Sequence, residues 1–559
     1  MDKQIGVFVC ECGPNIAGNV EIDMLLEAAA SMKGVALAER HKLLCSPDGQ
    51  KFLAEKIAEH GLTRVVVAAC SPKQHGPTFM GVCERAGLNP YLMQMANIRE
   101  QCAWIIEDKE EATRKALRHL RAATARVAHH APLEKLEIEC NPDVLIIGGG
   151  VAGMQAALLL ASGDREVYII ERSDSLGGAA VQFEKVFLAM RSAAEMIAER
   201  AARIKANPHI HVLTGCEPQE VVGFFGNFII TVGRPEAEPQ QIRAGAVVVA
   251  TGFELLAPEA LAPYGYGEVE DVLTSLEFER MNASGKIVLK NGQAPKSVAI
   301  LHCIGREERR YCSAVCCLYS MKLARYLKDK VPGAAVTEFY SDLCIPGRWQ
   351  QGFYRQTAEA GVEFVRASGA RAIEEGGRPA VKYVEEAGKE NSRTFDMVIL
   401  SPAMVAPHDA GQVAQMLGVE IGQSGFYAEE HPKLAPVSTS LEGVYVAGCA
   451  QGPKGISESA VQAGAAAGKI LSSLVPGRKL ETEAKTSVIS ALLCQGCQTC
   501  LKVCVYSAIR YDEAKDVCVV NEVLCKGCGN CAAACPSGAA RVKHFTPRQI
   551  GREVAEILR

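Results

Sequence analysis

C-Q-G-C-Q-T-C-L-K-V-C at residues 494–504 and C-K-G-C-G-N-C-A-A-A-C-P at residues 525–536 are the stretches that decide how this chain is interpreted. Each half has the spacing C-x2-C-x2-C-x3-C, in which three thiolates reach one iron-sulfur cubane and the fourth reaches its neighbour. The spacing predicts two 4Fe-4S clusters with the following ligands: Cys494, Cys497, Cys500 and Cys535 for one, and Cys525, Cys528, Cys531 and Cys504 for the other.

The same pattern is that of a bacterial two-cluster ferredoxin, so we expect an α+β ferredoxin domain at residues 486–546. Paired C-x2-C units also form tetrahedral zinc sites. Two quadruplets in tandem favour clusters over zinc. The chain departs from the ferredoxin pattern at one position: Val505, not proline, follows the fourth cysteine of the first run. Residues 547–559 are expected to form an amphipathic helix that docks a partner.

Length and composition indicate an ordinary globular protein. The 559 residues suggest three or four domains, and 48% are hydrophobic and 22% charged. The net charge of -4 gives no reason to expect nucleic acid. No apolar run approaches the roughly 18 residues of a membrane helix, and the first residues do not form a signal peptide, so we expect a cytoplasmic protein. The 23 cysteines fall in metal-ligand spacings, which favours bound thiolates over disulfides.

The first segment, residues 1–132, alternates strand-like and helical pieces and is expected to be an α/β domain. Strands at residues 5–9 and 64–69 run directly into cysteines, and α/β domains place ligands at strand ends. Four cysteines are therefore candidates for a third cluster: Cys10, Cys12, Cys45 and Cys70. The alternative is that small buried cysteines fill a core, as we expect of Cys83 and Cys102.

A dinucleotide-binding pattern follows a linker at residues 131–142. A strand at residues 144–147 runs into G-G-G-V-A-G and a helix at residues 154–161, and a second strand ends in Glu171, where a carboxylate meets the ribose. Later motifs resemble those of flavin disulfide reductases, which favours FAD over NAD. Cys449 stands where those enzymes usually have Asp. The expected cofactor-binding residues are Gly148, Gly150, Gly153, Glu171, Gly177, Gly178, Ala250, Thr251, Gly252, Gly448 and Cys449.

The middle of the chain departs from thioredoxin-reductase-like enzymes. These enzymes have a second dinucleotide turn, but here the strand at residues 297–301 runs into H-C-I-G-R-E-E-R-R-Y-C-S-A-V-C-C. Four cysteines within 15 residues favour another cluster, and they are Cys303, Cys312, Cys316 and Cys317. Cys312 and Cys316 have the spacing of two residues on one helix face. The alternative is a helix with a redox disulfide.

Three further stretches need an interpretation, and for two of them a functional one is weighed against a plain one. Lys454 in Q-G-P-K-G is a candidate to donate to flavin N5 or offset charge on the ring, and the alternative is a solvent-facing loop. G-A-A-A-G-K at residues 464–469 is one residue short of a P-loop, so we interpret it as a helix face. The helix at residues 107–130 ends in His129 and His130, which we expect in solvent.

The chain resembles the A-type subunit of heterodisulfide reductase, which is the flavin and iron-sulfur subunit of the methanogen enzyme and its bacterial relatives. The similarity spans nearly the whole chain: V-F-V-C-E-C-G-P-N-I-A-G, A-A-C-S-P-K-Q-H-G-P-T-F, A-G-L-N-P-Y-L-M-Q-M-A-N-I-R-E-Q-C-A-W, Y-C-S-A-V-C-C and G-C-A-Q-G-P-K-G-I-S-E-S. It implies a thioredoxin-reductase-like FAD domain at residues 133–475 with its own 4Fe-4S cluster, and an N-terminal domain with another. The longest relatives insert a further two-cluster ferredoxin where residues 228–249 pass only through R-P-E-A-E-P-Q-Q.

The resemblance implies an oxidoreductase subunit that passes electrons between FAD and clusters. In the family this flavin splits electron pairs by bifurcation, and the shorter chain leaves unsplit transfer as an alternative. Implied partners are B- and C-like subunits, a hydrogenase, formate dehydrogenase or other donor module, and ferredoxin as acceptor, with the chain as a dimer in a larger complex. Other interpretations are an NAD(P)H-linked flavoprotein with appended ferredoxin, a subunit of a quinone-linked complex, or a non-catalytic cluster carrier.

Overall fold

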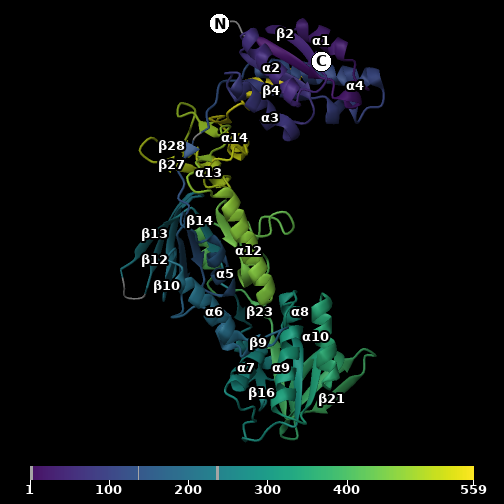
Figure 1. Cartoon of the computed structure of the whole chain (residues 1–559), viewed down its shortest axis with the longest axis vertical. Helices are drawn as coiled ribbons and strands as arrows, with labels where there is room; N and C mark the ends of the chain where they lie inside the picture. Colours follow the sequence, from purple (N-terminus) through teal and green to yellow (C-terminus); the bar gives the residue numbers. More distant parts are fainter. Residues whose placement is uncertain (1–3, 136, 235–237) are drawn as a thin grey trace. The chain divides into compact units, whose positions relative to one another are not determined.

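The computed structural model describes residues 4–135, 137–234 and 238–559, so residues 235–237 of the R-P-E-A-E-P-Q-Q stretch lie outside the described part. The chain divides into two compact units. One unit combines residues 1–138 with residues 481–559, and the other spans residues 139–480. The first and last segments of the sequence, each rich in cysteine, therefore belong to one unit (Figure 1).

The N-terminal segment folds as a parallel sheet with helices on both faces. Its strand order is β2-β1-β3-β4, with β2 (Val35–His41), β1 (Ile5–Cys10), β3 (Arg64–Ala69) and β4 (Met93–Asn97). Helices α1 (Ile22–Ala30) and α4 (Lys109–Val127) pack on one face. Helices α2 (Pro47–Glu59) and α3 (Pro72–Arg85) pack on the other. Nearly every residue of β1 and β3 is buried, because a parallel strand is covered on both faces.

The C-terminal segment of the same unit contains two small antiparallel ribbons and short helices. Strand β26 (Ser487–Ile489) pairs with β29 (Ala540–Val542), and β27 (Ile509–Asp512) with β28 (Val517–Val520). The short helices are α13 (Thr499–Lys502) and α14 (Asn530–Ala534). Cysteines and a few aliphatic side chains form its core.

The last helix, α15 (Pro547–Ile557), packs against α4 of the same chain. Arg126 on α4 forms a 2.6 Å ion pair with Glu553 on α15. His130, which we expected in solvent, is only 5% exposed, and its ring stacks at 4.2 Å on that of His544. That expectation is wrong because the C-terminal segment covers the end of α4, a contact that the local charge pattern does not show.

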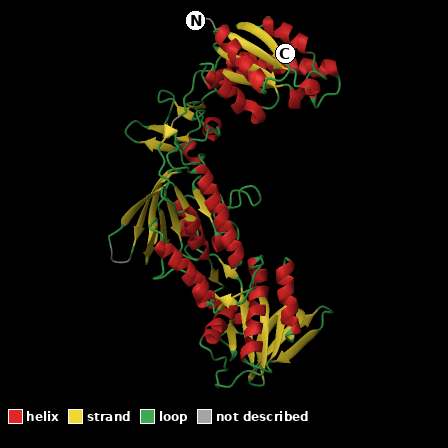
Figure 2. Ribbon diagram, in the orientation of Figure 1, coloured by secondary structure: helices red, strands yellow, loops and turns green. Residues whose placement is uncertain are grey.

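The second unit begins with a five-stranded parallel sheet in the order β10-β7-β6-β14-β24. Figure 2 shows the helices of the chain in red and its strands in yellow. The strands are β10 (Ile210–Thr214), β7 (Val167–Glu171), β6 (Val144–Ile147), β14 (Ala246–Val249) and β24 (Val444–Val446). Helices α5 (Val151–Leu160), α6 (Ala193–Ala206) and α12 (Ile456–Ser473) cover one face. The other face packs against α11 (Ala410–Leu417) and the ribbon β11 (Glu217–Phe224), β12 (Asn227–Gly233) and β13 (Gln240–Ala244).

A seven-stranded sheet completes this unit, with the order β16-β22-β17-β18-β19-β20-β21. Its strands are β16 (Val272–Thr274), β22 (Met397–Pro402), β17 (Ser297–Ile304), β18 (Ala335–Tyr340), β19 (Val362–Glu375), β20 (Arg378–Glu385) and β21 (Glu390–Thr394). Helices α7 (Ser275–Ala283) and α9 (Cys316–Lys330) pack on one face, and α10 (Arg348–Glu359) packs against α9.

The predicted strands at residues 5–9, 64–69 and 144–147 are confirmed, and the G-A-A-A-G-K stretch lies within helix α12. Two details differ. Strand β17 continues to Ile304 and so includes Cys303, and α9 begins only at Cys316, which leaves Cys312 in the preceding loop. The spacing of Cys312 and Cys316 is therefore not that of two residues on one helix.

Candidate functional site

The turn between β6 and α5 requires glycine at two positions. Gly148 has a φ of +109°, and a Cβ there would lie 2.4 Å from the carbonyl oxygen of Ala250. A Cβ on Gly153 would lie 1.9 Å from the carbonyl oxygen of Gly148. The glycines thus let α5 and the A-T-G segment approach the turn closely, which leaves the N-terminus of α5 open to a pyrophosphate.

Glu171 at the end of β7 is fixed by two backbone groups. Its Oε2 accepts a hydrogen bond from Gly149 N at 2.7 Å, and its Oε1 accepts one from Ser173 N at 2.8 Å. The carboxylate is buried and lines the same cavity as Gly148 and Gly150. This arrangement matches the position from which a carboxylate contacts the ribose of a dinucleotide.

A cavity of about 870 Å³ extends from this turn. Its size and its glycine-lined phosphate end fit a dinucleotide such as FAD. Most predicted cofactor residues line it: Gly148, Gly150, Glu171, Gly177, Gly178, Ala250, Thr251, Gly252 and Cys449. Gly153 and Gly448 pack just outside the lining residues. A Cβ on Gly153 would meet Gly148, and a Cβ on Gly448 would meet Ala152.

Lys454 lines the cavity, but its ammonium group is engaged by its own loop. The Nζ atom donates to the carbonyl oxygens of Gly448 at 2.7 Å and Gly452 at 2.8 Å. Burial lowers its pKa. The Cys449 thiol donates to the carbonyl oxygen of Lys454 at 3.3 Å, and burial raises its pKa. Both side chains therefore stabilise the loop that closes this part of the cavity.

Another part of the cavity wall contains a buried ion pair that no sequence motif indicated. Lys322 Nζ on α9 lies 2.8 Å from Glu279 Oε2 on α7, and both side chains are less than 5% exposed. Lys322 also donates to the carbonyl oxygen of Lys185 at 3.1 Å and lies 4.9 Å from the ring centroid of Phe183. Burial lowers the pKa of Lys322. The one local signal was a charged residue inside the apolar run of α9.

The ferredoxin-like segment brings one predicted ligand set around a second cavity, which Cys504, Cys525, Cys528 and Cys531 line together. This set, like the other, combines cysteines of both runs. Backbone N–H groups point at the sulfur atoms, as is common for cluster thiolates. Ser487 N lies 3.2 Å from Cys525 Sγ, and Ala508 N lies 3.3 Å from Cys504 Sγ.

The other predicted set has similar surroundings. Ala540 N donates to Cys535 Sγ at 3.4 Å, and Cys518 N donates to Cys494 Sγ at 3.5 Å. The thiol of Cys500 interacts with that of Cys518, and burial is the main cause of its raised pKa, to about 12. Cys518 is thus a close neighbour of this set that the spacing did not indicate.

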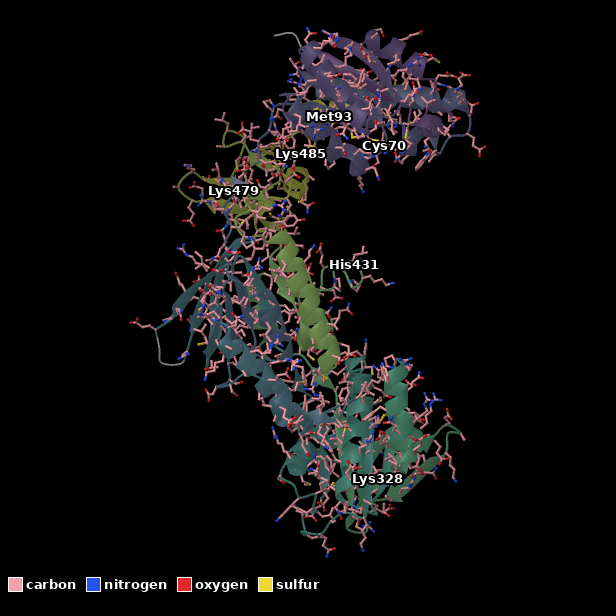
Figure 3. All side chains as sticks on the ribbon, in the orientation of Figure 1. Cys70, Met93, Lys328, His431, Lys479 and Lys485 are labelled. Carbon is pink, nitrogen blue, oxygen red and sulfur yellow. The ribbon has the colours of Figure 1, made fainter. Side chains whose placement is uncertain are left out.

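The four N-terminal cysteines converge at the carboxyl ends of β1 and β3. Cys10 interacts with Cys12 and Cys45, and Cys70, labelled in Figure 3, interacts with Cys10 and Cys45. Burial raises the pKa of Cys10, and it raises that of Cys70 to about 11. Arg99 Nη1 donates to Cys12 Sγ at 3.4 Å, which supplies positive charge beside this cluster of thiols.

The cysteines at the start of α9 form a fourth group. A hydrogen bond with Cys316 is the largest cause of the lowered pKa of both Cys312, to about 6, and Cys317, to about 4. Cys303 interacts with Cys316, and Arg306 Nη1 lies 3.9 Å from Cys303 Sγ. Cys344, which no spacing pattern included, joins this group: its N–H donates to Cys317 Sγ at 3.4 Å, and its thiol interacts with Cys312.

Two family models match the chain: pyridine nucleotide-disulphide oxidoreductase over residues 142–310, and the 4Fe-4S dicluster domain over residues 493–539. The A-type subunit of H(2):CoB-CoM heterodisulfide,ferredoxin reductase from Methanothermobacter marburgensis is 35% identical, over 92% of this chain and 91% of the relative. The A-type subunit of H(2)/formate:CoB-CoM heterodisulfide,ferredoxin reductase from Methanococcus maripaludis is 32% identical, over 98% and 97%. Among solved structures, T. acidophilum thioredoxin reductase is 17% identical with a TM-score of 0.40, over 59% of this chain and 98% of that one.

The FAD fold and the dicluster domain together define an iron-sulfur flavoprotein of the oxidoreductase class. The chain belongs to the family of A-type subunits of CoB-CoM heterodisulfide reductase. It is thus an FAD and iron-sulfur electron-transfer subunit, which confirms the predicted fold class and both types of cofactor. No helix in the described ranges is both long and apolar enough to cross a bilayer.

Proposed function

We propose that the chain transfers electrons between FAD in the large cavity and four 4Fe-4S clusters held by the predicted cysteine sets. FAD supplies two-electron chemistry, and each cluster exchanges one electron. Sixteen cysteines then serve as ligands: the eight of the ferredoxin-like segment, Cys10, Cys12, Cys45, Cys70, Cys303, Cys312, Cys316 and Cys317.

One observation carries this proposal: helix α9 serves two sites. Its first residues are Cys316 and Cys317, and its next turns place Tyr319, Lys322 and Leu323 in the wall of the FAD cavity. Since an α-helix rises 1.5 Å per residue, Cys316 and Tyr319 are about 4.5 Å apart along the axis. A cluster at the start of α9 is therefore an immediate neighbour of the cavity.

The partners follow from the family. The names of the relatives link them to H2, formate, ferredoxin and the CoB-CoM heterodisulfide. We infer that this chain likewise works with B- and C-like subunits and an electron-donor module, and exchanges electrons with ferredoxin. The Q-G-P-K-G loop with Lys454 and the Glu279–Lys322 pair both line the cavity, and we infer that they help to orient the flavin.

Anaerobic purification of the full chain tests this assignment. We expect one FAD and about 16 iron atoms per chain, four for each of four clusters. Cys316→Ala should remove about four irons and one EPR signal while FAD remains, and Cys140→Ser, outside all four sets, should change neither. A wild-type protein with zinc instead of iron, or without stoichiometric FAD, would contradict the proposal.

A further inference from the structure

A buried pair of ionisable side chains, His302 and Glu338, lies beside the cysteine group at the start of α9. His302 on β17 and Glu338 on the neighbouring strand β18 are joined by a 2.8 Å contact between Nε2 and Oε2. Both side chains are 0% exposed. No charge in this position is needed to form the sheet, because other core positions of these strands are aliphatic, including Val298, Ile300 and Val336.

Strand geometry directs His302 toward α9. Alternate side chains of a strand point to the same face, so His302 shares a face with Ile300, which packs with Leu323 on α9. Glu338 is the register partner of Ile300 in the parallel pair, so it belongs to that face too. His302 follows at the carboxyl end, where α9 begins with Cys317 and its neighbours.

The second nitrogen of His302 is available to donate, and the Cys317 thiol is a neighbour of the ring. Within the described part of the chain, Nδ1 is buried and has no hydrogen-bond partner. The two groups that interact with the ring are the Cys317 thiol and the Glu338 carboxylate. The ring thus lies between a carboxylate and a thiol.

The buried His302–Glu338 pair is energetically costly, and a role toward the Cys317 sulfur would account for its presence. Transfer of an ion pair from water to the interior costs several kcal/mol per ion, and well-packed apolar residues of similar size are often as stable. The sulfur of a cluster ligand is a group that benefits from a buried donor, because hydrogen bonds to sulfur offset the negative charge that reduction adds.

We propose that His302, held by Glu338, is a positioning residue that donates a hydrogen bond to the Cys317 thiolate and raises the reduction potential of the cluster bound there. The inference rests on the proposed function, in which Cys317 is a cluster ligand. The N–H of Cys344, 3.4 Å from the same sulfur, adds a second donor. Cys317 then accepts hydrogen bonds from two donors, and this cluster is the one next to the flavin cavity.

EPR-monitored redox titration of the full anaerobic protein tests the inference. The relevant signal is the one that Cys316→Ala removes. For His302→Phe, which keeps a ring but no donor, we expect the equilibrium constant for reduction to fall about tenfold, or about 59 mV for one electron. Glu338→Gln should shift it in the same direction, because the ring loses the carboxylate that holds it as a double donor. His302→Asn keeps an N–H near the Nδ1 position and should shift it less.

Ser320→Ala is the matched control, because the Ser320–Ser401 hydrogen bond is a buried polar contact on the same helix. We expect it to leave the potential unchanged. A wild-type potential in His302→Phe with full iron content would overturn the inference. If His302→Phe does not assemble the cluster, a wild-type potential in Glu338→Gln with full iron content would overturn it instead. Absence of the signal from the wild-type protein would refute the cluster assignment itself, so the two failures are distinguishable.

Discussion

Replacement of Gly153 by alanine is the sharpest test of the FAD site, because the same substitution has a sterically unhindered counterpart in another helix. A Cβ on Gly153 would lie 1.9 Å from Gly148 O and 3.2 Å from Ile146 Cγ2. Contacts of this kind normally exceed about 3 Å, so α5 must move by roughly 1 Å away from the turn. Overpacking typically costs about 1–3 kcal/mol, which exceeds the gain of about 1 kcal/mol from alanine in a helix.

The same change at Gly468 in α12 has the opposite expected sign. A Cβ there meets no atom within 4 Å, so only the helix propensity changes, and we expect about 0.5–1 kcal/mol of stabilisation. FAD content after gel filtration and the temperature of flavin release measure both effects. Gly153→Ala should lose FAD and unfold earlier, whereas Gly468→Ala should keep its FAD. Equal FAD content and stability in both variants would refute the close approach of α5 to the pyrophosphate turn.

Three further predictions concern other parts of the chain. Lys322→Met leaves the Glu279 carboxylate buried and unpaired, so calorimetry should show a loss of about 3 kcal/mol, which adding Glu279→Leu to the same chain partly recovers. Burial lowers the pKa of His130 to about 3, against about 6.5 in the unfolded chain. The contribution of this residue to the free energy of unfolding is therefore complete above pH 6.5 and falls by about 2 kcal/mol between pH 8 and pH 5. The denaturation midpoint of His130→Gln should depend less on pH than that of the wild-type protein. Cys504→Ser should remove about four irons, and unchanged iron would disprove ligation across the two runs.

The sequence predicted what depends on residues close together in the chain. A strand, a glycine turn and a helix within about 20 residues identify the phosphate end of the FAD cavity. Gly148 and Gly153 are needed locally, because a Cβ at either position would clash with nearby backbone. Cluster ligands in the ferredoxin-like segment follow in the same way from their x2 and x3 spacings. The predicted crossing of Cys504 to the second run agrees with the cavity it lines, although the residues between the runs reveal nothing of it.

Contacts between distant residues were not predictable. Glu279 and Lys322 are on separate helices, and His130 meets His544 across most of the chain length. Cys344 belongs to no spacing pattern, so only the fold shows that it joins Cys312 and Cys317. In each case a polar residue looked ordinary in its local sequence, and burial by a remote segment gave it a role.

The position of α9 shows why topology, and not the motif alone, links cluster and flavin. The sequence marks Cys316 and Cys317 as candidate ligands, but it cannot show that the same helix reaches the flavin cavity, because that cavity is built mainly by the other sheet. In related flavoproteins a second nucleotide turn follows the strand that corresponds to β17. Here that strand ends in His302, Cys303 and Ile304, and its carboxyl end faces the start of α9. The proposed cluster on these thiols lies beside the FAD cavity, and we expect it to exchange electrons with FAD directly, without a diffusing hydride donor.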